Sequence, residues 1–110
     1  MAEIKYTKKA FLDLDSIADY IENELFSPIA AYNTVNKIQD YIDSLSIFPL
    51  MGKSLSSVVD IDTDYRFLVC GKYLTFYRVE DDIVYIDRVI YGRRDYISIL
   101  FGNIIDDSGE

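Results

Sequence analysis

The chain has 110 residues, of which 50% are apolar and 27% are charged, and its formal net charge is −8 at pH 7. This composition is typical of a folded protein rather than a disordered one, and the length predicts a single domain over residues 1–110. The negative charge argues against generic nucleic-acid binding. The absence of histidine excludes Ser-His-Asp and Cys-His catalysis and ordinary zinc sites.

Residues 3–7 alternate in polarity and predict a short first strand. The next stretch has apolar residues at steps of three and four, which predicts a helix with its acidic residues on the solvent surface. The apolar stripe is Leu14, Ile17, Ala18, Ile21 and Leu25, and the acidic residues are Asp13, Asp15, Asp19 and Glu22.

Ser27 and Pro28 predict the start of a second helix, because serine caps a helix and proline suits its first turn. Its apolar stripe is Ala31, Val35, Ile38, Ile42 and Leu45, and it is expected to end before Pro49 and Gly52. The connection between the helices is short, so they are expected to form an antiparallel hairpin.

Residues 50–64 predict a loop or a short irregular strand, and three strands follow at 65–70, 73–79 and 83–91. Gly71 and Lys72 predict a type II′ turn, in which glycine supplies the positive φ. The predicted fold is α+β, in the order β-α-α-β-β-β with a short C-terminal helix or tail. An antiparallel sheet packs on the helix hairpin, and the first strand is expected to join the sheet because its backbone needs partners.

Neither a metal nor a cofactor is predicted. Asp60, Asp62 and Asp64 alternate, but the glycine and glutamate of a calcium loop do not follow them, so a solvated loop is favoured. Cys70 is the single cysteine and is predicted to be a small buried residue rather than a reactive thiol. No apolar run approaches the roughly 18–20 residues of a membrane span, and no secretory core begins the chain, so a cytoplasmic location with no membrane contact is expected.

All the arginines of the chain lie in its last third, on an otherwise acidic molecule: Arg66, Arg78, Arg88, Arg93 and Arg94. The first three lie on successive predicted strands, where cross-strand neighbours would gather them on one face. The alternative is that they form surface ion pairs with Asp87 or Glu80. The last two would offer guanidinium groups to a phosphate or to a carboxylate of another protein, or else pair with Asp95.

Several stretches, in this order and spacing, resemble the RelE/ParE superfamily of toxins from bacterial type II toxin–antitoxin modules. They are Ala10-x-x-Asp13-Leu14-x-x-Ile17-Ala18-x-Tyr20-Ile21, Ile42-x-x-Leu45, Pro49-x-x-Gly52, Tyr65-Arg66-Phe67-Leu68-Val69, Tyr73-Leu74-x-Phe76-Tyr77-Arg78-Val79 and Val84-x-Ile86-x-Arg88-Val89-x-Tyr91-Gly92-Arg93-Arg94-Asp95-Tyr96. The resemblance covers residues 3 to 101. It implies a cognate antitoxin as partner, and Arg78, Arg88, Arg93 and Arg94 are the candidate residues for binding the target or the antitoxin.

The superfamily that the chain resembles has two mechanisms, and the residues of this chain favour one of them. RelE-like members cut mRNA on the ribosome with basic side chains, whereas ParE-like members poison DNA gyrase. In RelE-like sequences an arginine follows the tyrosine of the middle strand, but here Leu74 follows Tyr73, and leucine cannot stabilise a phosphorane. Without histidine, the proton transfers of metal-independent cleavage also lack a group that titrates near neutrality.

The favoured prediction is therefore a plasmid-stabilisation toxin that inhibits DNA gyrase and is neutralised by its antitoxin. The alternatives are a ribosome-dependent mRNA endoribonuclease and an inactive relic. If the protein is a nuclease, its candidate catalytic residues are Arg66, Arg94, Lys53 and Tyr96.

Overall fold

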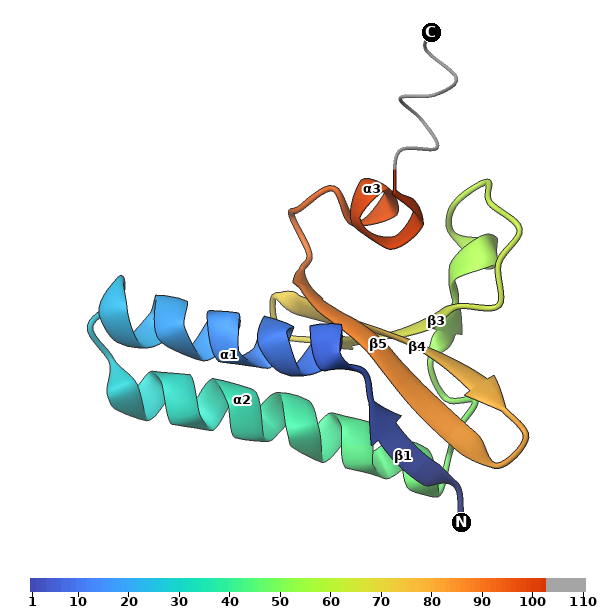
Figure 1. Ribbon diagram of the computed structural model, residues 1–110, viewed down its shortest axis with the longest axis horizontal. Helices are drawn as coiled ribbons and strands as arrows, with labels where there is room; N and C mark the ends of the chain where they lie inside the picture. The colour runs from blue at the N-terminus through green and yellow to red at the C-terminus, as the bar shows by residue number, and fades with distance from the viewer. Residues whose placement is uncertain (103–110) are drawn as a thin grey trace, which may run out of the picture.

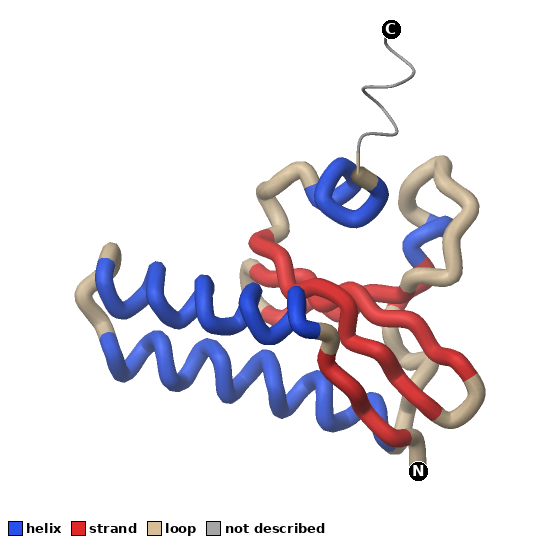
Figure 2. Tube along the Cα trace, in the orientation of Figure 1, coloured by secondary structure: helices blue, strands red, loops and turns tan. Residues whose placement is uncertain are grey.

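A five-stranded sheet with a hairpin of two long helices on one face forms most of the computed structural model, which describes residues 1–102 (Figures 1 and 2). The strands are β1 (Glu3–Tyr6), β2 (Lys53–Ser54), β3 (Arg66–Cys70), β4 (Tyr73–Glu80) and β5 (Ile83–Tyr91). The helices are α1 (Lys8–Asn23), α2 (Pro28–Asp43) and α3 (Tyr96–Phe101), with single 3₁₀ turns at Ser44–Ser46 and Leu55–Ser57. The predicted α+β fold is confirmed.

The two long helices begin where the sequence supplies caps. The Thr7 hydroxyl accepts a hydrogen bond from the Ala10 N–H at the start of α1, and the Ser27 hydroxyl accepts one from the Ala30 N–H at the start of α2. The end of α1 was predicted wrongly, because the helix stops at Asn23 and Leu25 lies in the link with 57% of its surface exposed. Phe26, with φ 55°, turns the chain towards α2.

The sheet order is β1-β5-β4-β3-β2, and the three long strands form the predicted antiparallel meander. The first strand joins the sheet as expected, but it pairs in parallel with β5, from Glu3 opposite Ile83 to Tyr6 opposite Ile86. The reason is that β1 runs directly into α1, so it fills the open edge of β5 while α1 crosses the face beside it (Figure 1).

Both turns of the meander need a positive φ at their first residue. Gly71 has φ 59°, in agreement with the predicted hairpin. The second turn is shorter than predicted, because Glu80 still pairs with Ile83 and only Asp81 and Asp82 lie outside the strands. Asp81 takes φ 55° there, a conformation that aspartate tolerates better than most residues.

Each face of the sheet has its own hydrophobic core. The larger core lies under α1 and α2 and includes the fully buried Ile38, Ile42 and Tyr77, and Cys70 is buried within it, where burial raises the pKa of its thiol. The smaller core lies on the other face, centred on Phe76, and is covered by α3 and the segment that contains Leu55. Cover on both faces agrees with the apolar residues predicted on each. Within residues 1–102, no helix is both long and apolar enough to cross a bilayer.

Candidate functional site

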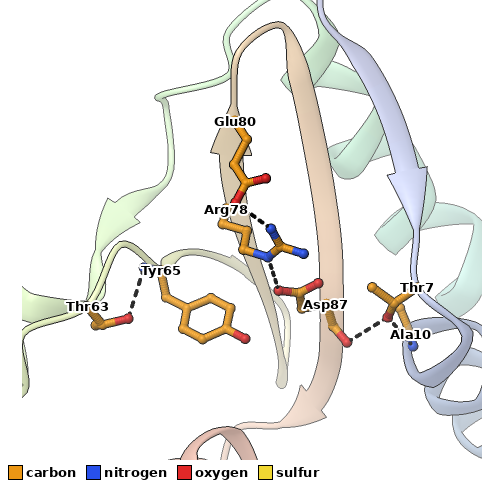
Figure 3. Close-up of polar contacts among 7 residues, drawn as sticks. All are labelled: Thr7, Ala10, Thr63, Tyr65, Arg78, Glu80 and Asp87. Atoms are coloured by element: carbon orange, nitrogen blue, oxygen red, sulfur yellow. Dashed lines mark hydrogen bonds and ion pairs between the residues drawn. The ribbon is translucent and has the colours of Figure 1, made fainter.

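A β-bulge on β5 sets the positions of the charged residues in the middle of the sheet. The register between β4 and β5 shifts between Phe76, which faces Arg88, and Tyr77, which faces Ile86, so Asp87 has no direct partner on β4. The extra residue places the carboxylate of Asp87 near the guanidinium of Arg78 (Figure 3).

Arg78 is held by two carboxylates and an aromatic ring. Its Nε donates to Asp87 Oδ2 at 2.8 Å and its Nη1 to Glu80 Oε1 at 2.8 Å (Figure 3). Its guanidinium also lies 4.5 Å from the centre of the Tyr85 ring. The hydrogen bond that Arg78 donates to the Asp87 carboxylate is the main cause of a raised pKa for Arg78. For Arg78 the structure therefore confirms the alternative prediction, a surface ion pair with Asp87 and Glu80.

Tyr65 is a second tyrosine beside this ion pair (Figure 3). Burial, and then the negative charge of Asp87, raise the pKa of its phenol above the ordinary value. The phenol therefore stays protonated at neutral pH and is a poor general base.

Arg88 is fixed by Asp13, which the sequence pattern wrongly placed on the solvent surface of the first helix. Arg88 Nε donates to Asp13 Oδ2 at 2.7 Å and Nη2 to Oδ1 at 2.8 Å, and the Val89 N–H donates to Oδ2 at 2.9 Å. Beside them the Thr7 hydroxyl donates to the Asp87 carbonyl at 3.0 Å. These hydrogen bonds provide partners for backbone groups of β5 at the point where β1 ends. Arg88 itself is paired with a residue 75 positions away in the chain.

Arg66 and the buried Tyr77 fix the segment that precedes β2. Arg66 Nη1 donates to the carbonyls of Gly52 at 2.8 Å and Leu50 at 3.3 Å. The Tyr77 hydroxyl donates to the Pro49 carbonyl at 2.9 Å and accepts from the Gly52 N–H at 2.9 Å. Gly52 is required there, because a Cβ at this position would lie 2.5 Å from the Tyr77 hydroxyl oxygen and 2.9 Å from the Phe67 carbonyl.

Tyr77→Phe is expected to lower the free energy of unfolding by about 2 kcal/mol, because it leaves the Gly52 N–H and the Pro49 carbonyl without their partner. The measurement is urea unfolding followed by circular dichroism. Tyr85→Phe is the matched control, since no hydrogen bond of the Tyr85 hydroxyl exists within residues 1–102, and we expect it to stay within about 0.5 kcal/mol of the parent. Equal stability of the two variants would contradict the role given to Tyr77.

The four candidate catalytic residues do not converge within residues 1–102. Arg66 is opposite Tyr77 and so points to the helix-covered face, whereas Lys53 is opposite Phe67 and points to the other face. Tyr96 also lies on that second face, with its ring 5.4 Å from the ring of Phe76. Within residues 1–102 no side-chain hydrogen bond or ion pair joins any two of the four, and the one bond between two of them is a backbone bond, from the Tyr96 N–H to the Arg94 carbonyl at 2.9 Å.

Arg93 and Arg94 are exposed where the chain leaves β5. In residues 1–102 neither guanidinium makes a hydrogen bond or an ion pair. The alternative of a pair with Asp95 is wrong for these residues, because the Asp95 carboxylate caps α3. It accepts from the Ser98 N–H at 3.3 Å and from the Ser98 hydroxyl at 2.8 Å.

A groove of about 620 Å³ opens beside Arg94, between α1 and the end of the sheet. It also contains Lys72, for which the sequence predicted only a place in a turn. The predicted meander could have pointed to it, because the turn at 71–72 then lies beside the end of the third strand, and the structure pairs Tyr73 with Tyr91 there. The lining residues are Asp13, Ser16, Ile17, Tyr20, Leu25, Lys72, Tyr73, Val89, Tyr91 and Arg94.

The helix hairpin and the sheet order are those of a toxin of the RelE/ParE superfamily, as the sequence motifs predicted. The family model of the ParE toxin of the type II toxin–antitoxin system, parDE, matches residues 4–96. The chain therefore belongs to the ParE toxin family, and a cognate antitoxin is the partner that this membership implies.

Two relatives agree with this assignment. The chain is 31% identical over 94 residues to Toxin RelE2 of Caulobacter vibrioides, a match that covers 86% of this chain and 99% of the relative. It is similar in structure to a chain of the chromosomal ParDE TA system from P. aeruginosa, with a TM-score of 0.70 and 27% identity. That match covers 83% of this chain and 96% of the other.

Proposed function

We propose that this toxin acts by binding a protein target, with DNA gyrase as the first candidate, and that it does not cut RNA. The observation that carries the proposal is the separation of the candidate catalytic groups. Arg66 is bound to backbone carbonyls and Tyr96 lies on the opposite face of the sheet. Cleavage would need a base, an acid and cations around one phosphate.

The candidate arginines that have no carboxylate partner within residues 1–102 suit recognition of another protein. Arg78 and Arg88 are held by carboxylates of the same chain, so the proposed binding residues reduce to Arg93 and Arg94. A guanidinium pairs with carboxylates in a planar, bidentate geometry. Because Arg93 and Arg94 are exposed, each can pair in this way with a carboxylate of the target. Leu74, on the face opposite the helices, packs in the smaller core and offers nothing to a phosphate.

Purified toxin is expected to inhibit supercoiling of relaxed plasmid by DNA gyrase. The double variant Arg93→Ala/Arg94→Ala is expected to need at least about ten times more protein for the same inhibition, because two charge-assisted contacts are lost. Lys37→Ala, an exposed cation on α2, is the matched control and should behave as the parent.

Expression in a bacterial host, with mapping of the 5′ ends of transcripts from the same culture, tests the other half of the proposal. We expect intact messages together with altered plasmid supercoiling. New in-frame cuts that disappear with Arg94→Ala, in a protein that remains folded, would establish an endoribonuclease and overturn the proposal. Normal growth with neither signal would overturn it in favour of an inactive protein.

A further inference from the structure

The link between the two long helices has an unusual backbone at Phe26. Within residues 1–102, the other positions with a positive φ are occupied by residues that tolerate it, namely Gly71, Asp81 and Gly102. Phe26 has φ 55° just after α1 ends, where glycine is the residue that helices usually have. A bulky side chain is strained in this conformation, and glycine would make the same turn without strain. The turn alone therefore does not explain a phenylalanine.

Packing within the protein does not explain it either. Phe26 keeps 85% of its surface exposed, and Ile29 and Tyr32, near the start of α2, keep 75% and 70%. Within residues 1–102, Met1 is the only large apolar residue that is more exposed than these three. Ile29 and Tyr32 are three positions apart, so they lie on one face of the helix. Phe26, Ile29 and Tyr32 are called the hairpin tip below, and Figure 1 shows the link that carries them at the far end of the hairpin.

Hydrogen bonds on both sides fix the backbone around Phe26. The Glu24 N–H donates to the Tyr20 carbonyl at 2.8 Å, and the Ser27 N–H donates to the Ile21 carbonyl at 3.2 Å. The Ser27 hydroxyl then caps the start of α2. The aromatic ring is therefore held in solvent by an ordered link. An apolar side chain on a preorganised backbone loses less conformational entropy on binding than one on a mobile loop.

The charges in the segment that contains the hairpin tip are negative. Between Lys9 and Lys37 the chain has no lysine or arginine, whereas Asp19, Glu22 and Glu24 lie just before the tip and are exposed. Two copies that met at their tips would bring these carboxylates together, and an anionic membrane surface would repel them. The complementary partner is a protein surface in which lysine or arginine residues surround an apolar pocket.

The hairpin tip is also near the arginines proposed above for target binding. Leu25, which precedes Phe26, and Arg94 line the same groove of about 620 Å³. Aromatic side chains bury about 150–250 Å² each. Three side chains therefore supply less than the roughly 800 Å² that each partner buries in a stable interface. The hairpin tip is too small to be an interface by itself, and the surface that continues it towards Arg94 belongs to the proposed target contact.

We propose that the hairpin tip is a second contact of this toxin with its protein target, in which Phe26 enters an apolar pocket that basic residues of the target surround. Ile29 and Tyr32 pack against the rim of the pocket and exclude water from it. This assignment rests on the target binding proposed above. It also explains the strain at Phe26, because binding needs the aromatic ring and folding does not.

Phe26→Gly separates folding from function. Glycine adopts φ 55° without strain, so the melting temperature, followed by circular dichroism, is expected to rise or to stay within about 2 °C of the parent. Inhibition of supercoiling by DNA gyrase is expected to need at least about ten times more of the variant, because the anchor is lost. Phe26→Leu keeps an apolar anchor and should inhibit better than Phe26→Gly. Phe48→Ala removes another exposed ring, beyond the opposite end of α2, and should inhibit as the parent does.

Growth of a bacterial host that expresses the same variants tests the hairpin tip without reference to gyrase. At equal protein levels, Phe26→Gly should relieve the growth arrest that the parent and Phe48→Ala cause. If the parent arrests growth without inhibiting gyrase, the proposed target is wrong, and relief by Phe26→Gly would still support the hairpin tip. Equal arrest by Phe26→Gly and the parent would overturn the hairpin tip and leave gyrase as the target. Absence of arrest by the parent would overturn both.

Three further results would also overturn the proposal. A melting temperature of Phe26→Gly more than about 5 °C below that of the parent would show that the phenylalanine serves the fold. A parent dimer that Phe26→Gly dissociates, seen by size-exclusion chromatography, would make the hairpin tip a contact between two copies. Flotation of the parent, but not of Phe26→Gly, with vesicles of phosphatidylcholine and phosphatidylglycerol in equal parts would assign the hairpin tip to a lipid surface. We expect the same elution volume for both proteins and no flotation of either.

Discussion

Replacement of Asp13 with alanine is expected to lower the free energy of unfolding by about 3 kcal/mol, the cost of removing one partner from a largely buried ion pair. The Asp13 carboxylate accepts three hydrogen bonds, two from Arg88 and one from the Val89 N–H. The two side chains keep only 13% and 20% of their surface in contact with solvent. Water can therefore replace little of what the variant loses.

Urea unfolding checks this expectation, with Asp15→Ala as the matched control two residues further along the same helix. Asp15 is exposed and should cost less than about 0.5 kcal/mol. The double variant Asp13→Ala/Arg88→Ala should be less destabilised than the sum of the single variants, because the two residues share one interaction. A loss below about 0.5 kcal/mol for Asp13→Ala would mean that the ion pair does not hold α1 to β5.

Phe76→Ala is expected to cost about 4 kcal/mol, the largest effect that we predict, because it empties the centre of the smaller core. Phe76 has no exposed surface, and the rings of Phe67 and Tyr96 lie 6.1 and 5.4 Å from its ring. The six residues of α3 are too few to form a stable helix alone. Loss of this packing should therefore release α3 and, with it, the fixed direction of Arg93 and Arg94.

Circular dichroism during urea unfolding measures the loss, and hydrogen exchange of the amides in α3 measures the release. Phe76→Leu keeps most of the volume and should cost about 1–2 kcal/mol while α3 stays protected. If α3 exchanges at the same rate in Phe76→Ala and in the parent, its attachment depends on contacts other than Phe76. If Phe76→Ala does not fold, Phe76→Leu still tests the direction of both effects.

Local signals in the sequence predicted the helices and the meander. Ser27 before Pro28 marks the start of α2, and Gly71 marks the tight turn between β3 and β4, because each of these preferences acts over a few residues. The parallel pairing of β1, the bulge at Asp87 and the partnership of Asp13 with Arg88 join positions distant in the chain. Nothing in a periodicity of two or 3.6 residues specifies such contacts.

The same division applies to the candidate site. Arginines next to a glycine at the end of a strand predicted the exposed position of Arg93 and Arg94. The internal partners of Arg88 and Arg66 were beyond prediction, because one is a helix residue 75 positions away and the others are backbone carbonyls of a loop. Lys72 was missed for a related reason, since its neighbours in the groove come from α1 and from β5.

The parallel pairing of the first strand with the last also determines when, during its synthesis, this toxin can fold. The Asp87 carbonyl, which accepts a hydrogen bond from the Thr7 hydroxyl, lies 80 residues later in the chain. β1 therefore has no strand to pair with until β5 has left the ribosome. A nascent chain stopped before that point contains the helix hairpin without the sheet that buries its apolar stripe. We expect such fragments to stay unfolded and open to proteases. Only a chain that already contains β5 can then hold Arg93 and Arg94 at the end of a folded sheet.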